Sequence, residues 1–159
     1  MTDQTGPGNG SPTGGGTDGI EGLRVLYAED HPSMQRAVSR LLRESGASVA
    51  IAHDGLEATE RALAETFDLV LMDLRMPCLD GFEAARALRA GVCRVLLVAV
   101  SADATPAVRA NALAAGFDAV LPKPFGLGDL IHALQLVREG PPAQTGVVSR
   151  AARRVSSPP

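Results

Sequence analysis

Polar residues follow four apolar runs of the sequence, each near the point where the run ends. Glu29 and Asp30 come directly after one run, and Asp73 follows another. Ser101 ends a third run, and Lys123 comes shortly after a fourth. Carboxylates are hard oxygen ligands that suit Mg²⁺, which takes a few of them together with water and phosphate oxygens. Each acid alone could equally be a solvated loop residue, so the chemistry depends on the fold bringing them together.

Lys123 is the single lysine among 15 basic residues, because every other one is arginine. Its ammonium group is a compact point charge that suits a phosphoryl oxygen. Acids that bind a cation, with a lysine and a hydroxyl on the phosphoryl oxygens, form the apparatus of in-line phosphoryl transfer. In such a site Asp73 would be the nucleophile that forms an acyl phosphate. The Ser101 hydroxyl could donate to the anion, although a lone serine here is more often a turn residue.

The middle of the chain alternates short apolar runs with amphipathic segments. Strands are predicted at residues 24–28, 48–52, 68–72, 94–100 and 119–121. Helices are predicted at residues 31–45, 55–65, 106–115 and 126–138, with one more through Phe82, Ala85 and Leu88. Alternation with short connections implies an α/β fold, a doubly wound parallel sheet covered by helices on both faces. Such sheets bind ligands at the carboxyl ends of their strands, which is where the polar residues stand.

Composition divides the 159 residues into three parts. Residues 1–21 are rich in Gly and Pro and are predicted to be a flexible head or linker. Residues 140–159 contain Pro, Ser and three arginines and are predicted to be a disordered tail, whose arginines could bind an anion. Residues 22–139 form the predicted domain. Hydrophobic residues are 45% and aromatic residues 3% of the chain, which predicts a soluble protein with an aliphatic core.

Charge and patterning exclude several classes of function. A net charge of -3 and a pI of about 5.6 argue against a nucleic-acid partner, which needs a basic face. No apolar stretch approaches the roughly 18 residues of a membrane span, and no signal run begins the chain. The two cysteines have neither metal-ligand spacing nor a disulfide framework. We therefore expect a cytoplasmic protein without a membrane or nucleic-acid partner.

Four motifs run through the core in order: 25–32 (VLYAEDHP), 69–77 (LVLMDLRMP) with 80–81 (DG), 100–102 (VSA) and 123–125 (KPF). Together they cover nearly the whole core, and the core resembles a response-regulator receiver domain of two-component signalling. The resemblance implies a flavodoxin-like, five-stranded sheet in the order 2-1-3-4-5 with five helices. It also implies signalling through the surface of the fourth helix, the fifth strand and the fifth helix.

The resemblance further implies a role for each polar residue. Asp73 would accept a phosphoryl group from the phosphohistidine of a histidine kinase or a histidine phosphotransfer protein. The implied Mg²⁺ ligands are Glu29, Asp30, Asp73 and the backbone carbonyl of Arg75. Ser101 would be the switch hydroxyl and Lys123 the phosphate-binding cation, with a cis bond to Pro124. Such a domain is not a turnover enzyme and catalyses only its own phosphorylation and dephosphorylation.

One position departs from the family pattern. Receiver domains usually have Tyr or Phe three residues before the lysine, and here that residue is Val120. Tyr27, on the first strand, cannot take its place. Switching through rotation of an aromatic ring is therefore not expected, which leaves movement of the Ser101 loop open as a switch. Cys78 is predicted to be a plain loop thiol rather than a redox modulator. The three histidines are predicted to be surface residues, the first of them beside the acid pair: His31, His53 and His132.

Three alternatives stand beside this interpretation. The chain could be a stand-alone regulator or the receiver of a hybrid sensor kinase, and the sequence does not separate the two. An aspartate-based phosphatase would place a second Asp two residues after Asp73, where this chain has Arg75. A degenerate receiver that only binds a protein partner would have lost the acid pair, Asp73 or Lys123, and all are present.

Overall fold

The computed structural model describes residues 19–139. Its strands are β1 (Arg24–Ala28), β2 (Ser48–Ala52), β3 (Leu69–Asp73), β4 (Leu96–Ser101) and β5 (Ala119–Pro122). Its helices are α1 (Pro32–Glu44), α2 (Gly55–Ala64), α3 (Gly81–Ala90), α4 (Pro106–Ala115) and α5 (Leu127–Glu139). The predicted tail and most of the predicted head lie outside the described residues.

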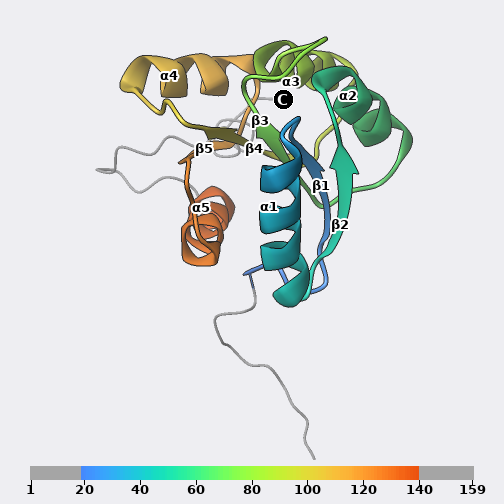
Figure 1. Cartoon of the computed structure of the whole chain (residues 1–159). Helices are drawn as coiled ribbons and strands as arrows, with labels where there is room; N and C mark the ends of the chain where they lie inside the picture. Colours follow the sequence, from blue (N-terminus) through green and yellow to red (C-terminus); the bar gives the residue numbers. More distant parts are fainter. Residues whose placement is uncertain (1–18, 140–159) are drawn as a thin grey trace, which may run out of the picture.

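The five strands form one parallel sheet in the order β2-β1-β3-β4-β5. Neighbouring strands pair in register, for example Tyr27 with Ile51 of β2 and with Leu71 of β3. All strands therefore end at the same edge of the sheet, which is the upper edge in Figure 1. The predicted fold class and strand order are confirmed.

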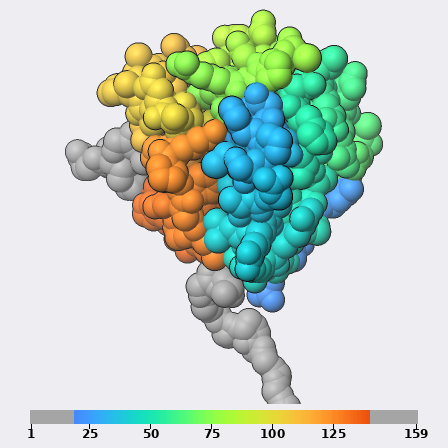
Figure 2. All heavy atoms as spheres, viewed as in Figure 1, coloured from blue at the N-terminus to red at the C-terminus, as the bar shows by residue number. Residues whose placement is uncertain are grey.

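Alternate side chains of each strand point to opposite faces of the sheet and form two core clusters. One cluster packs under α2, α3 and α4 and includes Leu26, Val70 and Leu97. The other packs under α1 and α5 and includes Tyr27 and Leu71. Figure 2 shows α1 and α5 side by side on the face that they cover. Burial on both faces explains why the central strands are almost continuously apolar.

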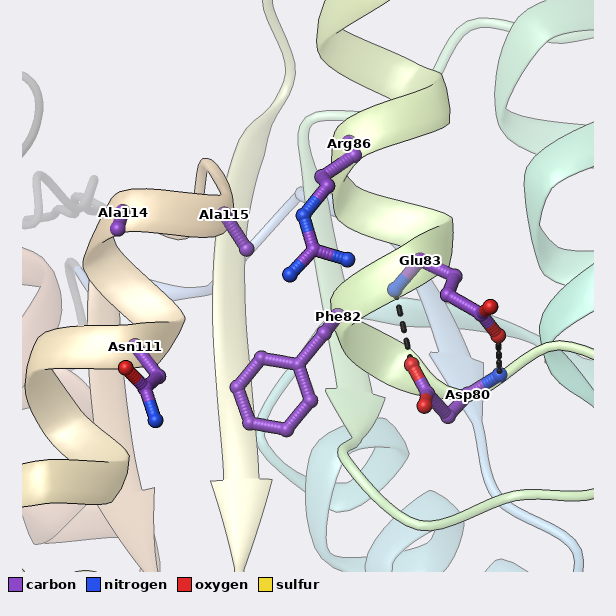
Figure 3. A pocket seen from close by; sticks show the side chains of 7 residues that line it. All are labelled: Asp80, Phe82, Glu83, Arg86, Asn111, Ala114 and Ala115. Atoms are coloured by element: carbon purple, nitrogen blue, oxygen red, sulfur yellow. Dashed lines mark hydrogen bonds between the residues drawn. The ribbon is translucent and has the colours of Figure 1, made fainter.

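Local sequence signals set the helix starts near the carboxyl edge. Pro32 and Pro106 stand in the first turns of α1 and α4, where a missing backbone N–H is tolerated. Asp80 begins α3 with a capping box, in which its side chain accepts from the backbone N–H of Glu83 at 2.8 Å (Figure 3). The Glu83 side chain in turn accepts from the backbone N–H of Asp80 at 3.2 Å. The loop after β3 therefore leads into a firmly fixed helix.

Several predicted helix and strand ends differ from the structure by one residue, and two further differences have a structural reason. Strand β4 begins at Leu96 rather than at residue 94, because Arg89 binds the backbone carbonyls of Cys93 and Val95. Ile20 falls within the predicted head, yet its side chain is buried in the cluster under α1 and α5. The chain thus joins the core before residue 22.

Candidate functional site

Four polar residues gather where β1 and β3 end. Ligand atoms of Glu29, Asp30, His31 and Asp73 all lie within 4.8 Å of one another. Glu29 is fully buried and Asp73 is 5% exposed, so water does little to screen the two carboxylates from each other. The convergence of the three acids predicted from the strand ends is confirmed in geometry.

Lys123 places its ammonium group between two of these acids. Nζ donates to Oδ2 of Asp73 at 2.8 Å and to Oε1 of Glu29 at 3.1 Å. The Lys123–Pro124 peptide bond is cis, as the family resemblance implied. One cation thus offsets part of the repulsion between two buried carboxylates.

Glu29 is held at both carboxylate oxygens. Oε1 accepts from Lys123 and from the Tyr27 hydroxyl at 3.1 Å. Oε2 accepts from the backbone N–H of His31 at 3.2 Å and lies 3.0 Å from Nδ1 of the same residue. The flexible glutamate side chain is therefore fixed in one orientation.

These contacts shift the pKa values of the two buried acids, Asp73 and Glu29, in opposite directions. Burial raises the pKa of Asp73 and the charge of Glu29 adds to the rise, although hydrogen bonds from Lys123 and Arg75 oppose it. Burial also favours protonation of Glu29, but hydrogen bonds from His31 and Lys123 outweigh it, so its pKa is lowered. Burial acts to lower the pKa of Lys123, yet its contacts with Asp73 and Glu29 raise it overall. Glu29 and Lys123 therefore hold their charges firmly.

The acid cluster fits a small divalent cation. Oδ1 of Asp30 is buried and makes no hydrogen bond to any of the described residues, although Nδ1 of His31 lies 3.3 Å away and pairs with it when protonated. A buried carboxylate oxygen without a hydrogen bond is costly unless a positive charge, either a protonated imidazole or a metal ion, lies beside it. Because oxygen atoms of three acids lie close together, the donor set is the hard one that Mg²⁺ prefers.

The backbone around Asp73 is shaped by close packing. The backbone N–H of Arg75 donates to Oδ1 of Asp73 at 2.9 Å. This hydrogen bond holds the backbone of Arg75 close to the acid. At Gly81 a Cβ atom would lie 2.7 Å from both the Asp73 carbonyl oxygen and the Leu74 Cα. Only glycine therefore allows the start of α3 to approach the end of β3. The assignment of the Arg75 carbonyl as a metal ligand stays a prediction.

The Ser101 hydroxyl faces its own loop rather than the acids. Oγ donates to the carbonyl of Asp103 at 2.9 Å and accepts from the Asp103 N–H at 3.1 Å. The backbone of Ser101 does reach the site, since its carbonyl accepts from the N–H of Lys123 at 2.8 Å. A role of the hydroxyl toward an anion thus requires the loop to rearrange.

The weaker candidates are also placed. Val120 is buried in the core cluster under α3 and α4, and its carbonyl lies 3.5 Å from the Arg109 guanidinium. Cys78 is exposed in the loop after β3, with a positive φ of 70°. His31, His53 and His132 are exposed, as predicted. His31 nevertheless belongs to the acid cluster, which its sequence neighbours only suggested.

Sequence reasoning missed two buried arrangements. Tyr27 was assigned no role in the site, yet its hydroxyl binds Glu29. Arg89 binds the fully buried Asp118 at 3.0 Å and the carbonyl of Gly116 at 2.9 Å, which joins α3 to the start of β5. Asp118 also accepts from the backbone N–H of Leu97 at 2.9 Å. No local pattern marks either pair, although a tyrosine two residues before an acid on a buried strand hints at the first.

A shallow groove lies apart from the acid cluster, between α3 and α4. Phe82 and Arg86 of α3 face Asn111 of α4 across it (Figure 3). None of the acids at the ends of β1 and β3 lines this groove, so it is not an extension of the site.

None of the helices in residues 19–139 has the length and apolar character needed to cross a lipid bilayer.

Comparisons with known proteins agree with this geometry. The family model of the response regulator receiver domain matches residues 25–135. The response regulator MprA of Mycobacterium avium is 34% identical over 113 residues, which are 71% of this chain and 50% of MprA. The chain therefore spans about half the length of this curated relative.

Solved receiver domains share the fold. The receiver domain of the sensor histidine kinase PA1611 from Pseudomonas aeruginosa, with a magnesium ion coordinated in its active-site cleft, is 38% identical. That match has a TM-score of 0.66 and covers 72% of this chain and 95% of the other. The receiver domain of Ssk1 from Saccharomyces cerevisiae, solved with the histidine phosphotransfer protein Ypd1, is 30% identical. That match has a TM-score of 0.64 and covers 70% of this chain and 85% of the other.

Three observations agree with one another. The sheet is doubly wound in the order 2-1-3-4-5, an acid cluster with a lysine lies at its strand ends, and the family model matches residues 25–135. The chain therefore belongs to the response regulator receiver domain family of two-component signalling.

Proposed function

We propose that Asp73 accepts a phosphoryl group from the phosphohistidine of a histidine kinase or a histidine phosphotransfer protein. The observation that carries the proposal is the ammonium group of Lys123 at 2.8 Å from Oδ2 of Asp73. A nucleophilic carboxylate beside a fixed cation is the arrangement that phosphoryl transfer requires, because negative charge gathers on the transferred oxygens. The Ypd1–Ssk1 complex supports a histidine phosphotransfer protein as one class of donor.

The transfer exchanges one bond for another. A carboxylate oxygen of Asp73 attacks phosphorus, an O–P bond forms, and the P–N bond to the donor imidazole breaks. The imidazole nitrogen keeps the electron pair of that bond and then takes a proton from water. The Lys123 ammonium group, which contacts the Asp73 carboxylate before transfer, is placed to bind the phosphoryl oxygens after it. Water later hydrolyses the acyl phosphate, so the domain catalyses only its own phosphorylation and dephosphorylation.

Glu29, Asp30, Asp73 and the Arg75 carbonyl are the residues that would hold Mg²⁺. When bound, the ion would offset the charge of the carboxylates and of the phosphoryl oxygens. The buried Oδ1 of Asp30, which makes no hydrogen bond to the described residues, supports this assignment. The magnesium ion in the PA1611 receiver domain supports it independently.

Signalling would begin at Ser101. Its hydroxyl would leave Asp103 and donate to a phosphoryl oxygen on Asp73, which draws the loop between β4 and α4 toward the site. The surface of α4, β5 and α5 would change with it. Val120 is small and buried under this surface, so the change would rest on the loop rather than on rotation of an aromatic ring. We place this function in the cytoplasm, together with its kinase or phosphotransfer partner.

Beryllofluoride, a stable mimic of the phosphoryl group, separates this function from that of a degenerate receiver that only binds a partner. When beryllofluoride is titrated into the full chain with Mg²⁺, we expect saturable changes in the NMR chemical shifts of backbone amides. These changes should appear at Ser101 and Lys123 and across α4, β5 and α5. Asp73→Asn should abolish them all. If the wild-type chain shows no shifts at any concentration, the phosphoacceptor function is wrong and the binding-only alternative replaces it.

A further inference from the structure

Tyr27 lies under the acid cluster on the face of the sheet that α1 and α5 cover. Its side chain is fully buried among Val38, Leu42 and Leu71 of that core cluster. A phenol hydroxyl in such a place needs a partner, and here the partner is Oε1 of Glu29 at 3.1 Å. A phenyl ring would fill the same space, so the hydroxyl adds only this one contact.

The direction of this hydrogen bond is fixed by chemistry. Burial first and the charge of Glu29 second raise the pKa of Tyr27, which keeps the phenol protonated. The lowered pKa of Glu29 keeps the acceptor ionised. The phenol therefore donates to the carboxylate oxygen, and charge-assisted hydrogen bonds of this kind are the strong ones.

Lys123 shares Oε1 of Glu29 with Tyr27 but also binds Asp73. In the proposed function, Lys123 is drawn toward the phosphoryl oxygens when Asp73 is modified. Of the two side chains that donate to Oε1, Tyr27 alone has no competing partner among the described residues. The hydroxyl would keep this oxygen in place while the lysine moves.

We infer that Tyr27 is a positioning residue, whose buried hydroxyl holds the Glu29 carboxylate in the orientation that binds the divalent cation. Glu29 has three rotatable side-chain bonds, and fixing it in advance lowers the entropy lost when the cation binds. Groups that orient metal ligands in this way commonly change metal affinity by 10-fold to 100-fold. The inference rests on the proposed cation site, but not on transfer of a phosphoryl group.

The test titrates Mg²⁺ alone into the full chain and measures binding from the NMR chemical shifts of the backbone amides. Tyr27→Phe should weaken Mg²⁺ binding by about 10-fold, at the lower end of the range for such groups. The matched control is Thr59→Val, which removes a buried hydroxyl that bonds only the Gly55 carbonyl inside α2. It should bind Mg²⁺ as the wild-type chain does.

A double-mutant cycle separates positioning from general loosening of the core. Glu29→Asp draws the carboxylate back by one methylene and out of reach of the hydroxyl. In that background Tyr27→Phe should change Mg²⁺ affinity less than about twofold if the two residues act as one unit. A full 10-fold loss in both backgrounds would overturn the inference, as would wild-type affinity in Tyr27→Phe alone.

The wild-type chain offers a readout that needs no variant. It contains one Tyr and no Trp, so its intrinsic emission comes from Tyr27 alone. We expect this emission to change with Mg²⁺ at the midpoint given by the amide shifts, because the cation alters the carboxylate that quenches the phenol. An emission that stays constant through saturation would overturn the inference even if Tyr27→Phe did not fold.

Phosphorylation is measured on the same samples by intact mass. Wild-type phosphorylation together with unchanged Mg²⁺ binding in Tyr27→Phe would remove the role of Tyr27 and leave the proposed function standing. The opposite pair of results, weakened Mg²⁺ binding in the variant and no phosphorylation of the wild-type chain, would remove the proposed function and leave the role of Tyr27.

Discussion

The ammonium group of Lys123 lies 2.8 Å from Oδ2 of Asp73, although 50 residues separate the two in the chain. The pair meets because β5 and β3 end at the same edge of the sheet, on either side of β4. The ammonium and carboxylate are 17% and 7% exposed as side chains, so solvent screens their attraction only in part.

Loss of the Lys123 ammonium should slow phosphorylation of Asp73 more than any change outside the acid cluster. We expect Lys123→Ala to lower the rate by about 10²-fold to 10³-fold, because a fixed charge that stabilises the transition state is removed. Lys123→Arg should recover only part of it, since a planar guanidinium does not replace a point charge. Intact mass over time measures both rates, and a wild-type rate in Lys123→Ala would contradict the assignment.

Gly81 is required for space, which a pair of glycine variants can show. A Cβ at Gly81 would lie 2.7 Å from backbone atoms of Asp73 and Leu74, whereas a Cβ at Gly128 in α5 meets nothing within 4 Å. Gly81→Ala should lower the free energy of unfolding by about 1–3 kcal/mol. Gly128→Ala should leave it equal or raise it. Urea denaturation measures both, and equal effects would refute the packing argument.

The buried pair of Arg89 and Asp118 should be a main support of the fold. Arg89→Ala leaves Asp118 buried without its guanidinium and should cost about 3–5 kcal/mol. Arg86→Ala, on the exposed side of the same helix, is the control and should change stability by less than about 0.5 kcal/mol. If thermal unfolding of the two variants coincides, the pair is not a support.

His31 should make the stability of the metal-free chain depend on pH. Its hydrogen bond to Glu29, and then the charges of Asp30 and Glu29, raise its pKa above the unfolded value. Its stabilising contribution is therefore fully present below about pH 6.5 and is lost as the pH rises through the raised pKa. The stability difference between wild type and His31→Gln should be larger near about pH 5.5 than near about pH 8.5. Denaturation in the presence of a chelator measures it, and a difference independent of pH would contradict the contact.

The elements of the fold could be predicted because each has a local signal. The apolar runs at β1 and β2 and the proline-led segment of α4 match the structure residue for residue. The start of β4 could not be predicted, because the carbonyls of Cys93 and Val95 are bound by the side chain of Arg89, four and six residues earlier, instead of by a neighbouring strand. The predicted boundary fails here because a side chain binds backbone groups that the apolar pattern assigns to the sheet.

The candidate site divides in the same way. That the acids and Lys123 meet at one edge follows from parallel strands, since the edge is common to all of them. Which hydrogen-bond partner each polar side chain takes does not follow, because this depends on the rotamer that the side chain adopts in the packed site. The bond from Tyr27 to Glu29 and the turn of Ser101 toward Asp103 are both of this kind.

The most direct test of the central claim is intact mass after incubation with Mg²⁺ and phosphoramidate, whose P–N bond is that of phosphohistidine. The wild-type chain should gain one phosphoryl group, and Asp73→Asn should gain none. Asp68→Asn, just before the other end of β3, is the matched control and should behave as wild type. Borohydride reduction of the acyl phosphate should then mark Asp73 alone. A phosphoryl group that persists in Asp73→Asn, or a wild-type chain that binds beryllofluoride but gains none, would contradict transfer onto Asp73.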